Sequence, residues 1–159
     1  MWERHSSLPC LSAHQRNNEG DNTMNSQDPI LVYVEDDENS ILVMKMVVER
    51  VMGLPTLHVL QSRADFVQQV KDLGVVPDVI LLDIHMKPYG GIELLSMLRG
   101  DPQFKCSKVV ALTASVTNEE VTLLKSSGFD GAIAKPLNID AFPDLITQII
   151  NGEQIWYIA

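Results

Sequence analysis

The segment "PDVILLDIHMKPYGG", residues 77–91, combines a strand signal with a single acid at the strand's end. Four consecutive apolar residues, 79–82, lead directly into Asp83, and a loop rich in proline and glycine follows. An unbroken apolar run is typical of a strand that is buried on both faces, as in a parallel sheet. The acid that ends this run is therefore either an exposed turn residue or part of a functional site.

Similar apolar runs recur along the chain and alternate with helical patterns. The strand-type runs lie at 30–34, 56–60, 79–82, 108–112 and 132–134, and the helical patterns at 40–52, 63–73, 91–99, 117–128 and 142–150. Five strand–helix units predict a doubly wound α/β fold, with a five-stranded parallel sheet, helices on both faces and right-handed crossovers. A closed barrel of such units requires eight, so we expect an open sheet.

Helices are expected to begin at residues whose side chains can accept a bond from a free backbone N–H group. Asn39 or Ser40 is the expected cap of the first helix, and Asp140 is the expected cap of the last. Thr117 and Glu120 have the spacing of a capping box, in which each side chain bonds the other residue's backbone N–H. Gly128 is suited to end the helix that this box begins.

The composition fits one globular domain and excludes several kinds of partner. Of the 159 residues, 45% are apolar, and the net charge is −9. An acidic chain disfavours direct contact with nucleic acid or with an anionic membrane surface, and leaves metal cations and basic protein surfaces as partners. No apolar run approaches the ~18–20 residues of a membrane span, so we expect no membrane insertion.

Cys10 and Cys106 lack zinc or CxxC spacing, so we expect two unlinked thiols and a cytoplasmic location.

The chain divides into three parts by composition. Residues 1–27 are polar without a sustained period and are expected to form a disordered tail, with Met24 as an alternative start that would make 1–23 an extension. Residues 28–150 form the expected domain, and 151–159 a short C-terminal tail.

Polar residues follow four of the five predicted strands. They are Glu35, Asp36 and Asp37 after the first strand, Asp83 after the third, Thr113 after the fourth and Lys135 after the fifth. Since ligands bind beyond the carboxyl ends of the strands in open α/β sheets, these residues are candidates for one site. Two carboxylates about 5 Å apart repel by ~3 kcal/mol at an effective dielectric of ~20. A lysine or a divalent cation must therefore compensate them, and oxygen ligands suit Mg²⁺ or Mn²⁺.

Such a site suits phosphoryl transfer. A carboxylate can act as a nucleophile toward a phosphoryl group and form an aspartyl-phosphate. A metal ion and a lysine would neutralise the phosphoryl oxygens, and a hydroxyl group would bond another of them.

Four motifs carry a resemblance to a known family. "VEDD" (34–37), "LLDIHM" (81–86), "ALTA" (111–114) and "AKP" (134–136) each fall at a predicted strand end. With them, residues 29–150 resemble the receiver domain of two-component response regulators. The resemblance implies a flavodoxin-like strand order of 2-1-3-4-5 and a cis bond between Lys135 and Pro136.

The resemblance also implies a role for each site residue. Asp83 would accept a phosphoryl group from the phosphohistidine of a histidine kinase, and Thr113 and Lys135 would contact that group. Glu35, Asp36, Asp83 and the backbone carbonyl of His85 would hold Mg²⁺, with Mn²⁺ as a substitute.

As a stand-alone receiver, the chain would signal through phosphorylation-dependent contacts with a downstream protein effector or pass the phosphoryl group on in a phosphorelay. Its partners would be a histidine kinase or phosphotransfer protein and that effector. It would not be an enzyme beyond self-phosphotransfer and autodephosphorylation.

Two positions depart from the family pattern and keep alternatives open. Lys87 stands where the family usually has proline, with Pro88 next, and Ala132 stands where an aromatic is frequent. Ala132 leaves room for a pseudo-receiver that binds partners without phosphorylation. The second alternative is an aspartyl-phosphate phosphatase of the haloacid dehalogenase type. That chemistry typically uses a second Asp two residues after the first, where this chain has His85.

Overall fold

The computed structural model describes residue 10, residues 28–115 and residues 117–157. The predicted N-terminal tail and the alternative start at Met24 lie outside the described residues, apart from Cys10. The described strands are β1 (Leu31–Val34), β2 (Leu57–Leu60), β3 (Val79–Asp83), β4 (Lys108–Thr113), β5 (Gly131–Ala134) and β6 (Ile155–Tyr157). The helices are α1 (Glu38–Met46), α2 (Phe66–Asp72), α3 (Gly91–Arg99), α4 (Asn118–Ser127) and α5 (Phe142–Ile150), with a π-helical continuation of α1, Val47–Val51, and a 3₁₀ turn, Pro102–Phe104.

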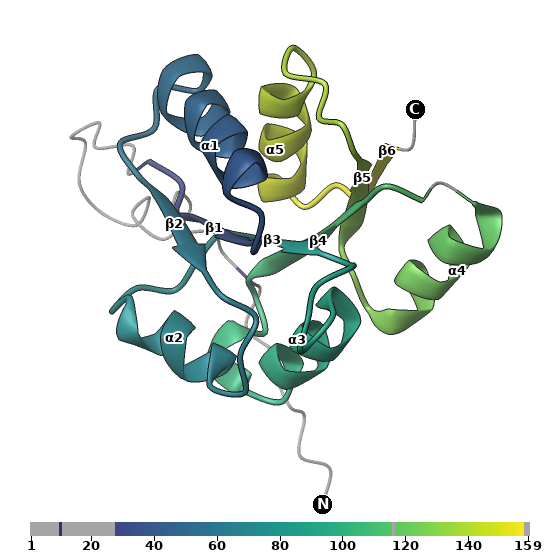
Figure 1. The fold of residues 1–159 in the computed structure, drawn as a ribbon. Helices are drawn as coiled ribbons and strands as arrows, with labels where there is room; N and C mark the ends of the chain where they lie inside the picture. The colour runs from purple at the N-terminus through teal and green to yellow at the C-terminus, as the bar shows by residue number, and fades with distance from the viewer. Residues whose placement is uncertain (1–9, 11–27, 116, 158–159) are drawn as a thin grey trace, which may run out of the picture.

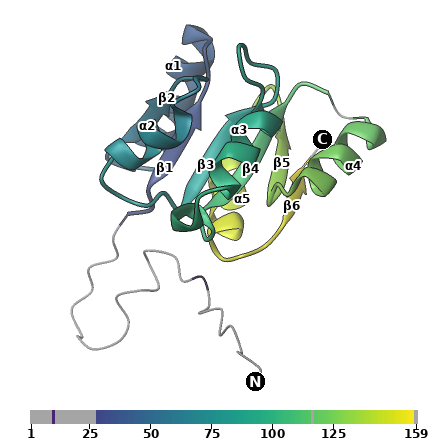
Figure 2. The same cartoon turned by 90° about the horizontal axis from the view of Figure 1, so that it is seen from below.

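The strands form one parallel sheet in the order β2-β1-β3-β4-β5-β6. Helices α1 and α5 cover one face, and α2, α3 and α4 cover the other (Figures 1 and 2). The predicted doubly wound α/β fold and the order 2-1-3-4-5 are confirmed, and a sixth strand extends the sheet beyond β5.

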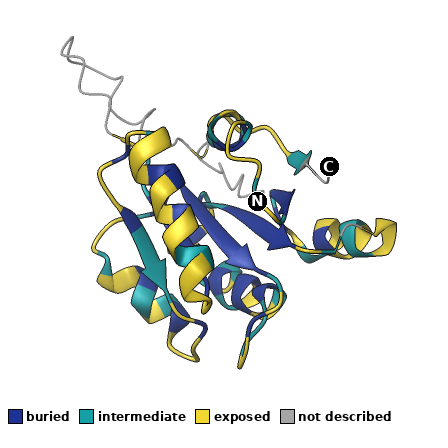
Figure 3. Ribbon diagram, turned by 45° about the horizontal axis from the view of Figure 1, so that its top comes forward, coloured by how far each residue is buried: buried dark blue, intermediate teal, exposed yellow. Residues whose placement is uncertain are grey.

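Each face of the sheet has its own apolar core, which explains the unbroken apolar strands. Along β3, Val79 and Leu81 pack toward α1 and α5, whereas Ile80 and Leu82 pack toward α2, α3 and α4. All four are fully buried, as expected for a central parallel strand. Figure 3 shows the buried strands in the middle of the fold and exposed residues on the outer sides of the helices.

Two of the expected helix caps are wrong. The first helix is capped by Asp37, whose Oδ2 accepts a bond of 2.8 Å from the Ser40 N–H, rather than by Asn39 or Ser40. Ahead of the last helix, Asn138 Oδ1 accepts bonds from the N–H groups of residues 140 and 141, and Asp140 does not cap. In both cases the capping side chain lies two or three positions earlier than the sequence pattern predicts.

The predicted helix end at Gly128 is confirmed, and one half of the predicted capping box forms. Thr117 caps α4 by accepting a bond from the Glu120 N–H, and Gly128 ends the helix with a φ of 99°, in the left-handed region that suits glycine. The expected cis bond between Lys135 and Pro136 is present, and the bond between Lys87 and Pro88 is also cis.

The sixth strand lies in the segment that the sequence assigns to a C-terminal tail. β6 pairs with β5 in parallel, and Trp156 lies opposite the buried Ala132. The Trp156 ring packs on the face covered by α2, α3 and α4, with Lys125 Nζ 5.0 Å from the ring centroid. Gly131 permits this approach, because a Cβ atom there would lie 2.5 Å from the Ile155 carbonyl oxygen. A strand of three residues gives too short a pattern to be seen in sequence.

The expectation of two unlinked thiols is also wrong. Cys10 and Cys106 form a disulfide in this structure, with Cα atoms 5.1 Å apart. The two cysteines are 96 positions apart in the chain and show no motif spacing, so sequence alone gives no sign of the pairing.

Within the described residues, no helix is both long and apolar enough to span a membrane.

We expect Gly131→Ala to separate β6 from β5, because the added methyl group would overlap the Ile155 carbonyl oxygen. Such an overlap costs about 1–3 kcal/mol unless the backbone moves. Amide hydrogen exchange in the segment 155–157 should rise severalfold, while exchange in β4 stays unchanged. Gly100→Ala, at a position with negative φ outside the sheet, is the control. Unchanged protection of 155–157 in Gly131→Ala would contradict this account of β6.

Candidate functional site

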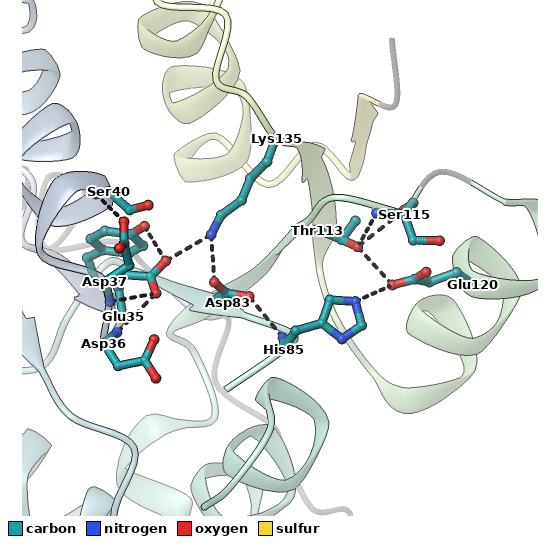
Figure 4. Close-up of polar contacts among 11 residues, drawn as sticks. Glu35, Asp36, Asp37, Ser40, Asp83, His85, Thr113, Ser115, Glu120 and Lys135 are labelled. Atoms are coloured by element: carbon teal, nitrogen blue, oxygen red, sulfur yellow. Dashed lines mark hydrogen bonds and ion pairs between the residues drawn. The ribbon is translucent and has the colours of Figure 1, made fainter. Parts of the chain in front are cut away.

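The carboxyl edge of the sheet brings the predicted site residues together from four strands (Figure 4). Glu35 and Asp36 follow β1, Asp83 ends β3, Thr113 ends β4 and Lys135 follows β5. Because β1 lies beside β3 and β3 beside β4, residues far apart in sequence meet at one edge.

Asp83 is held on both of its carboxylate oxygens. Oδ2 accepts a bond of 2.6 Å from Lys135 Nζ, and Oδ1 accepts a bond of 2.9 Å from the His85 backbone N–H. The residue is 9% exposed, so it lies at the mouth of the site rather than deep in the core. The strand-end acid is therefore paired, and its partner comes from 52 residues further along the chain.

Lys135 bridges two acids. Its Nζ also donates to Glu35 Oε2 at 2.8 Å. Burial by itself lowers the pKa of Lys135, but the hydrogen bonds to Asp83 and Glu35 outweigh it and raise the pKa above its usual range. The ammonium group thus stays charged and compensates the two carboxylates, as the repulsion argument requires.

Glu35 is the most constrained acid of the site. It is 2% exposed, and Oε2 also accepts a bond of 2.9 Å from the Tyr33 hydroxyl. Oε1 accepts bonds from the N–H groups of residues 36 and 37 at 3.0 and 3.1 Å. Burial raises the pKa of Glu35, but hydrogen bonds led by that of Lys135 lower it to about 2. Sequence reasoning missed Tyr33, whose signal is a hydroxyl group within an otherwise apolar strand.

Asp36 and Asp37 differ in role. The Asp36 side chain is exposed, and its pKa is raised, chiefly by interaction with the Glu35 carboxyl group. Its negative charge therefore lacks the compensation that Lys135 gives to Glu35 and Asp83. Asp37 caps α1, and its bond to Ser40 lowers its pKa.

The donor set of this edge fits a hard divalent cation. The carboxylates of Glu35, Asp36 and Asp83 are oxygen ligands of the kind that Mg²⁺ prefers. The raised pKa of Asp36 arises chiefly from its hydrogen-bonding interaction with the Glu35 carboxyl group. In the arrangement described, however, Lys135 stands between Glu35 and Asp83. Among the described residues no three His, Cys, Asp or Glu side chains are already grouped as a metal site.

Thr113 lies at the expected strand end, but its hydroxyl group bonds elsewhere. The residue is 1% exposed, and Oγ1 donates to Glu120 Oε1 at 2.8 Å. The same oxygen accepts a bond of 3.0 Å from the Ser115 N–H. The structure thus joins Glu35, Asp83 and Lys135 by direct hydrogen bonds and places Thr113 beside them. The spacing of Thr117 and Glu120 predicts a capping role for Glu120, and its side-chain contact with Thr113 was not foreseen.

A cavity of about 720 Å³ opens beside Asp36. Its wall includes Glu35, Arg63, Lys87 and Tyr89. Lys87, the residue in the family's usual proline position, therefore lines a space next to the acids and adds a cation to its wall.

The family model of the response regulator receiver domain matches residues 30–147. The chain is 33% identical over 83 residues to a nitrate/nitrite response regulator protein homolog of Haemophilus influenzae, a match covering 52% of this chain and 39% of that protein. It is 27% identical over 75 residues to the polar-differentiation response regulator DivK of Brucella ovis, covering 47% of this chain and 61% of that protein. The matches thus span less than two thirds of either relative.

Solved structures give the same fold. A two-component response regulator from Legionella pneumophila superposes with a TM-score of 0.64 at 28% identity, covering 78% of this chain and 98% of that chain. The chemotaxis protein CheY4 of Vibrio cholerae also superposes with a TM-score of 0.64, at 19% identity, covering 76% and 98%. The chain belongs to the response regulator receiver domain family, the receivers of two-component systems.

We expect Lys135→Met to destabilise the fold by about 3 kcal/mol at pH 7, because it leaves two sheltered carboxylates without their cation. Denaturant unfolding measures this loss, and Lys45→Met, at an exposed position on α1, should change stability by less than about 0.5 kcal/mol. A loss in Lys135→Met no larger than in the control would contradict the pairing.

The pH dependence gives a second readout of the same variant. In the wild type the pKa of Glu35 lies at about 2, below its usual 4.5, so its stabilisation is full above about pH 4.5 and is lost as pH falls toward 2. Lys135→Met removes the hydrogen bond that does most to lower the pKa of Glu35. Between about pH 4.5 and pH 2 this variant should therefore lose less stability than the wild type. Equal losses would show that Lys135 does not set the Glu35 pKa.

Proposed function

We propose that this receiver accepts a phosphoryl group on Asp83 from the phosphohistidine of a histidine kinase or phosphotransfer protein. It then signals through phosphorylation-dependent contacts with an effector protein, or passes the group on in a phosphorelay. The observation that best supports this is the Asp83 carboxylate at the mouth of the site, with Lys135 Nζ 2.6 Å from Oδ2. A nucleophile and a cation for the phosphoryl oxygens are thus side by side.

In the transfer step, an Asp83 carboxylate oxygen forms a bond to phosphorus while the bond from phosphorus to the donor's histidine nitrogen breaks. The imidazole leaves with its electron pair and takes up a proton. Lys135, already within hydrogen-bonding distance, neutralises charge on the phosphoryl oxygens. The His85 N–H fixes the carboxylate plane through Oδ1, so little reorganisation precedes attack.

Glu35, Asp36, Asp83 and the backbone carbonyl of His85 would hold Mg²⁺, or Mn²⁺ in its place. When bound, the ion would supply Lewis-acid neutralisation of phosphoryl charge. Tyr33 and the N–H groups of residues 36 and 37 orient Glu35 for this role. Thr113 would donate its hydroxyl hydrogen to a phosphoryl oxygen once that group is in place.

The chemistry proposed for the chain itself is self-phosphotransfer and autodephosphorylation, without turnover of a separate substrate. Residue 85, two positions after the acceptor, is His, and its exposed imidazole does not supply the second carboxylic acid of a phosphatase pair.

We place the protein in the cytoplasm, with a histidine kinase or phosphotransfer protein upstream and a protein effector downstream. The Cys10–Cys106 disulfide is the observation against that compartment.

Acetyl phosphate with Mg²⁺ tests the proposal directly. We expect the full chain to gain the mass of one phosphoryl group in intact-mass spectrometry, and Asp83→Asn to gain none. Asp72→Asn, an exposed acid on α2, is the control and should behave like the wild type. If no adduct forms at all, whatever the concentration of Mg²⁺ or Mn²⁺, the proposal is overturned and a pseudo-receiver is favoured. Turnover of a general phosphomonoester would favour a phosphatase.

A further inference from the structure

The hydroxyl group of Thr113 is held by a carboxylate on another element. Thr113 Oγ1 lies 2.8 Å from Glu120 Oε1 and 3.2 Å from the Ser115 carbonyl oxygen. The shorter contact is to a charged acceptor and is the stronger of the two. The Glu120 side chain is 15% exposed, so water competes weakly for this bond. The resting hydroxyl group is therefore directed toward α4 and away from the acids of the site (Figure 4).

Glu120 also belongs to the first turn of α4. Its backbone N–H donates to Thr117 Oγ1 at 3.2 Å, which forms one half of the expected capping box. The carboxylate that the other half would use bonds Thr113 instead. This side-chain bond thus ties the start of α4 to the end of β4.

The same carboxylate lies near the loop that follows Asp83. His85 Nε2 lies 3.8 Å from Glu120 Oε1, while the His85 N–H bonds Asp83 Oδ1. Glu120 is therefore linked to Asp83 through residue 85, and it also holds the Thr113 hydroxyl group at the end of the neighbouring strand β4 (Figure 4).

A threonine hydroxyl has one hydrogen to donate. If Thr113 donates it to a phosphoryl oxygen on Asp83, it cannot donate it to Glu120. A phosphoryl group carries up to two negative charges and three acceptor oxygens, so it competes well for the donor and repels a nearby carboxylate. The two acceptors exclude each other.

We propose that Glu120 is a positioning residue that holds Thr113 and the first turn of α4 in the resting arrangement, and that phosphorylation of Asp83 releases it. This inference rests on the proposed function, since it requires a phosphoryl group on Asp83. The release would loosen the start of α4 and change the surface that this helix offers to an effector.

Amide hydrogen exchange at residues 118–121 of the full chain tests this. Unphosphorylated Glu120→Ala should exchange about fivefold faster there than the wild type, the factor expected for loss of one hydrogen bond. Glu119→Ala is the matched control, because it removes an equal charge from the same helical turn. Glu120→Gln keeps an acceptor oxygen and should restore most of the protection. Equal exchange in the two alanine variants would overturn the inference.

Two further experiments distinguish a failure of this inference from a failure of the proposed function. In a Thr113→Val background, Glu120→Ala should have no added effect, because its partner is already absent; a full added effect would overturn the positioning role. After acetyl phosphate and Mg²⁺, wild-type exchange at 118–121 should rise to the Glu120→Ala level, with the adduct verified by mass. An adduct without that rise overturns the inference alone. No adduct overturns the proposed function, and the inference with it.

Discussion

Two sheltered carboxylates share the ammonium group of Lys135, and the rest of the site depends on this arrangement. Nζ lies 2.6 Å from Asp83 and 2.8 Å from Glu35, so one cation that follows β5 joins an acid that follows β1 and an acid that ends β3. Removing the cation would leave two repelling charges out of water, where neither is well solvated. The contact therefore requires the strand order that the fold provides, and in turn stabilises that edge of the sheet.

Lys135 pairs with Glu35 and Asp83, and the exposed Asp36 carboxylate lies outside this pairing. Asp36 is exposed, and its interaction with the Glu35 carboxyl group raises its pKa. Thr113, the remaining polar group, is bonded to Glu120 rather than to the acids. Asp83 and Lys135 are thus already paired in the site, while the Thr113 hydroxyl group is held by Glu120 of α4. Where the family often has an aromatic on β5 this chain has Ala132, and Trp156 of the added strand β6 packs on that face.

Much of the fold could be predicted because its cause is local. The apolar run at 79–82 predicts a strand that is buried on both faces. Acids that follow such strands predict a site at the carboxyl edge of the sheet. The features that the sequence did not predict depend on tertiary contacts. Glu120 has capping-box spacing, but sequence cannot tell that its carboxylate turns to Thr113. Likewise β6 exists because Gly131 admits it, and Cys10 meets Cys106 because the fold brings them together.

The pairing of Lys135 with Asp83 can be measured by a double-mutant cycle. Unfolding free energies of the wild type, Lys135→Met, Asp83→Asn and the double variant are compared at pH 7 without divalent cations. If Lys135 holds the acid as the structure shows, the double variant will lose less stability than the sum of the single losses, by about 1–3 kcal/mol. Losses that simply add would contradict the interaction on which the site is built.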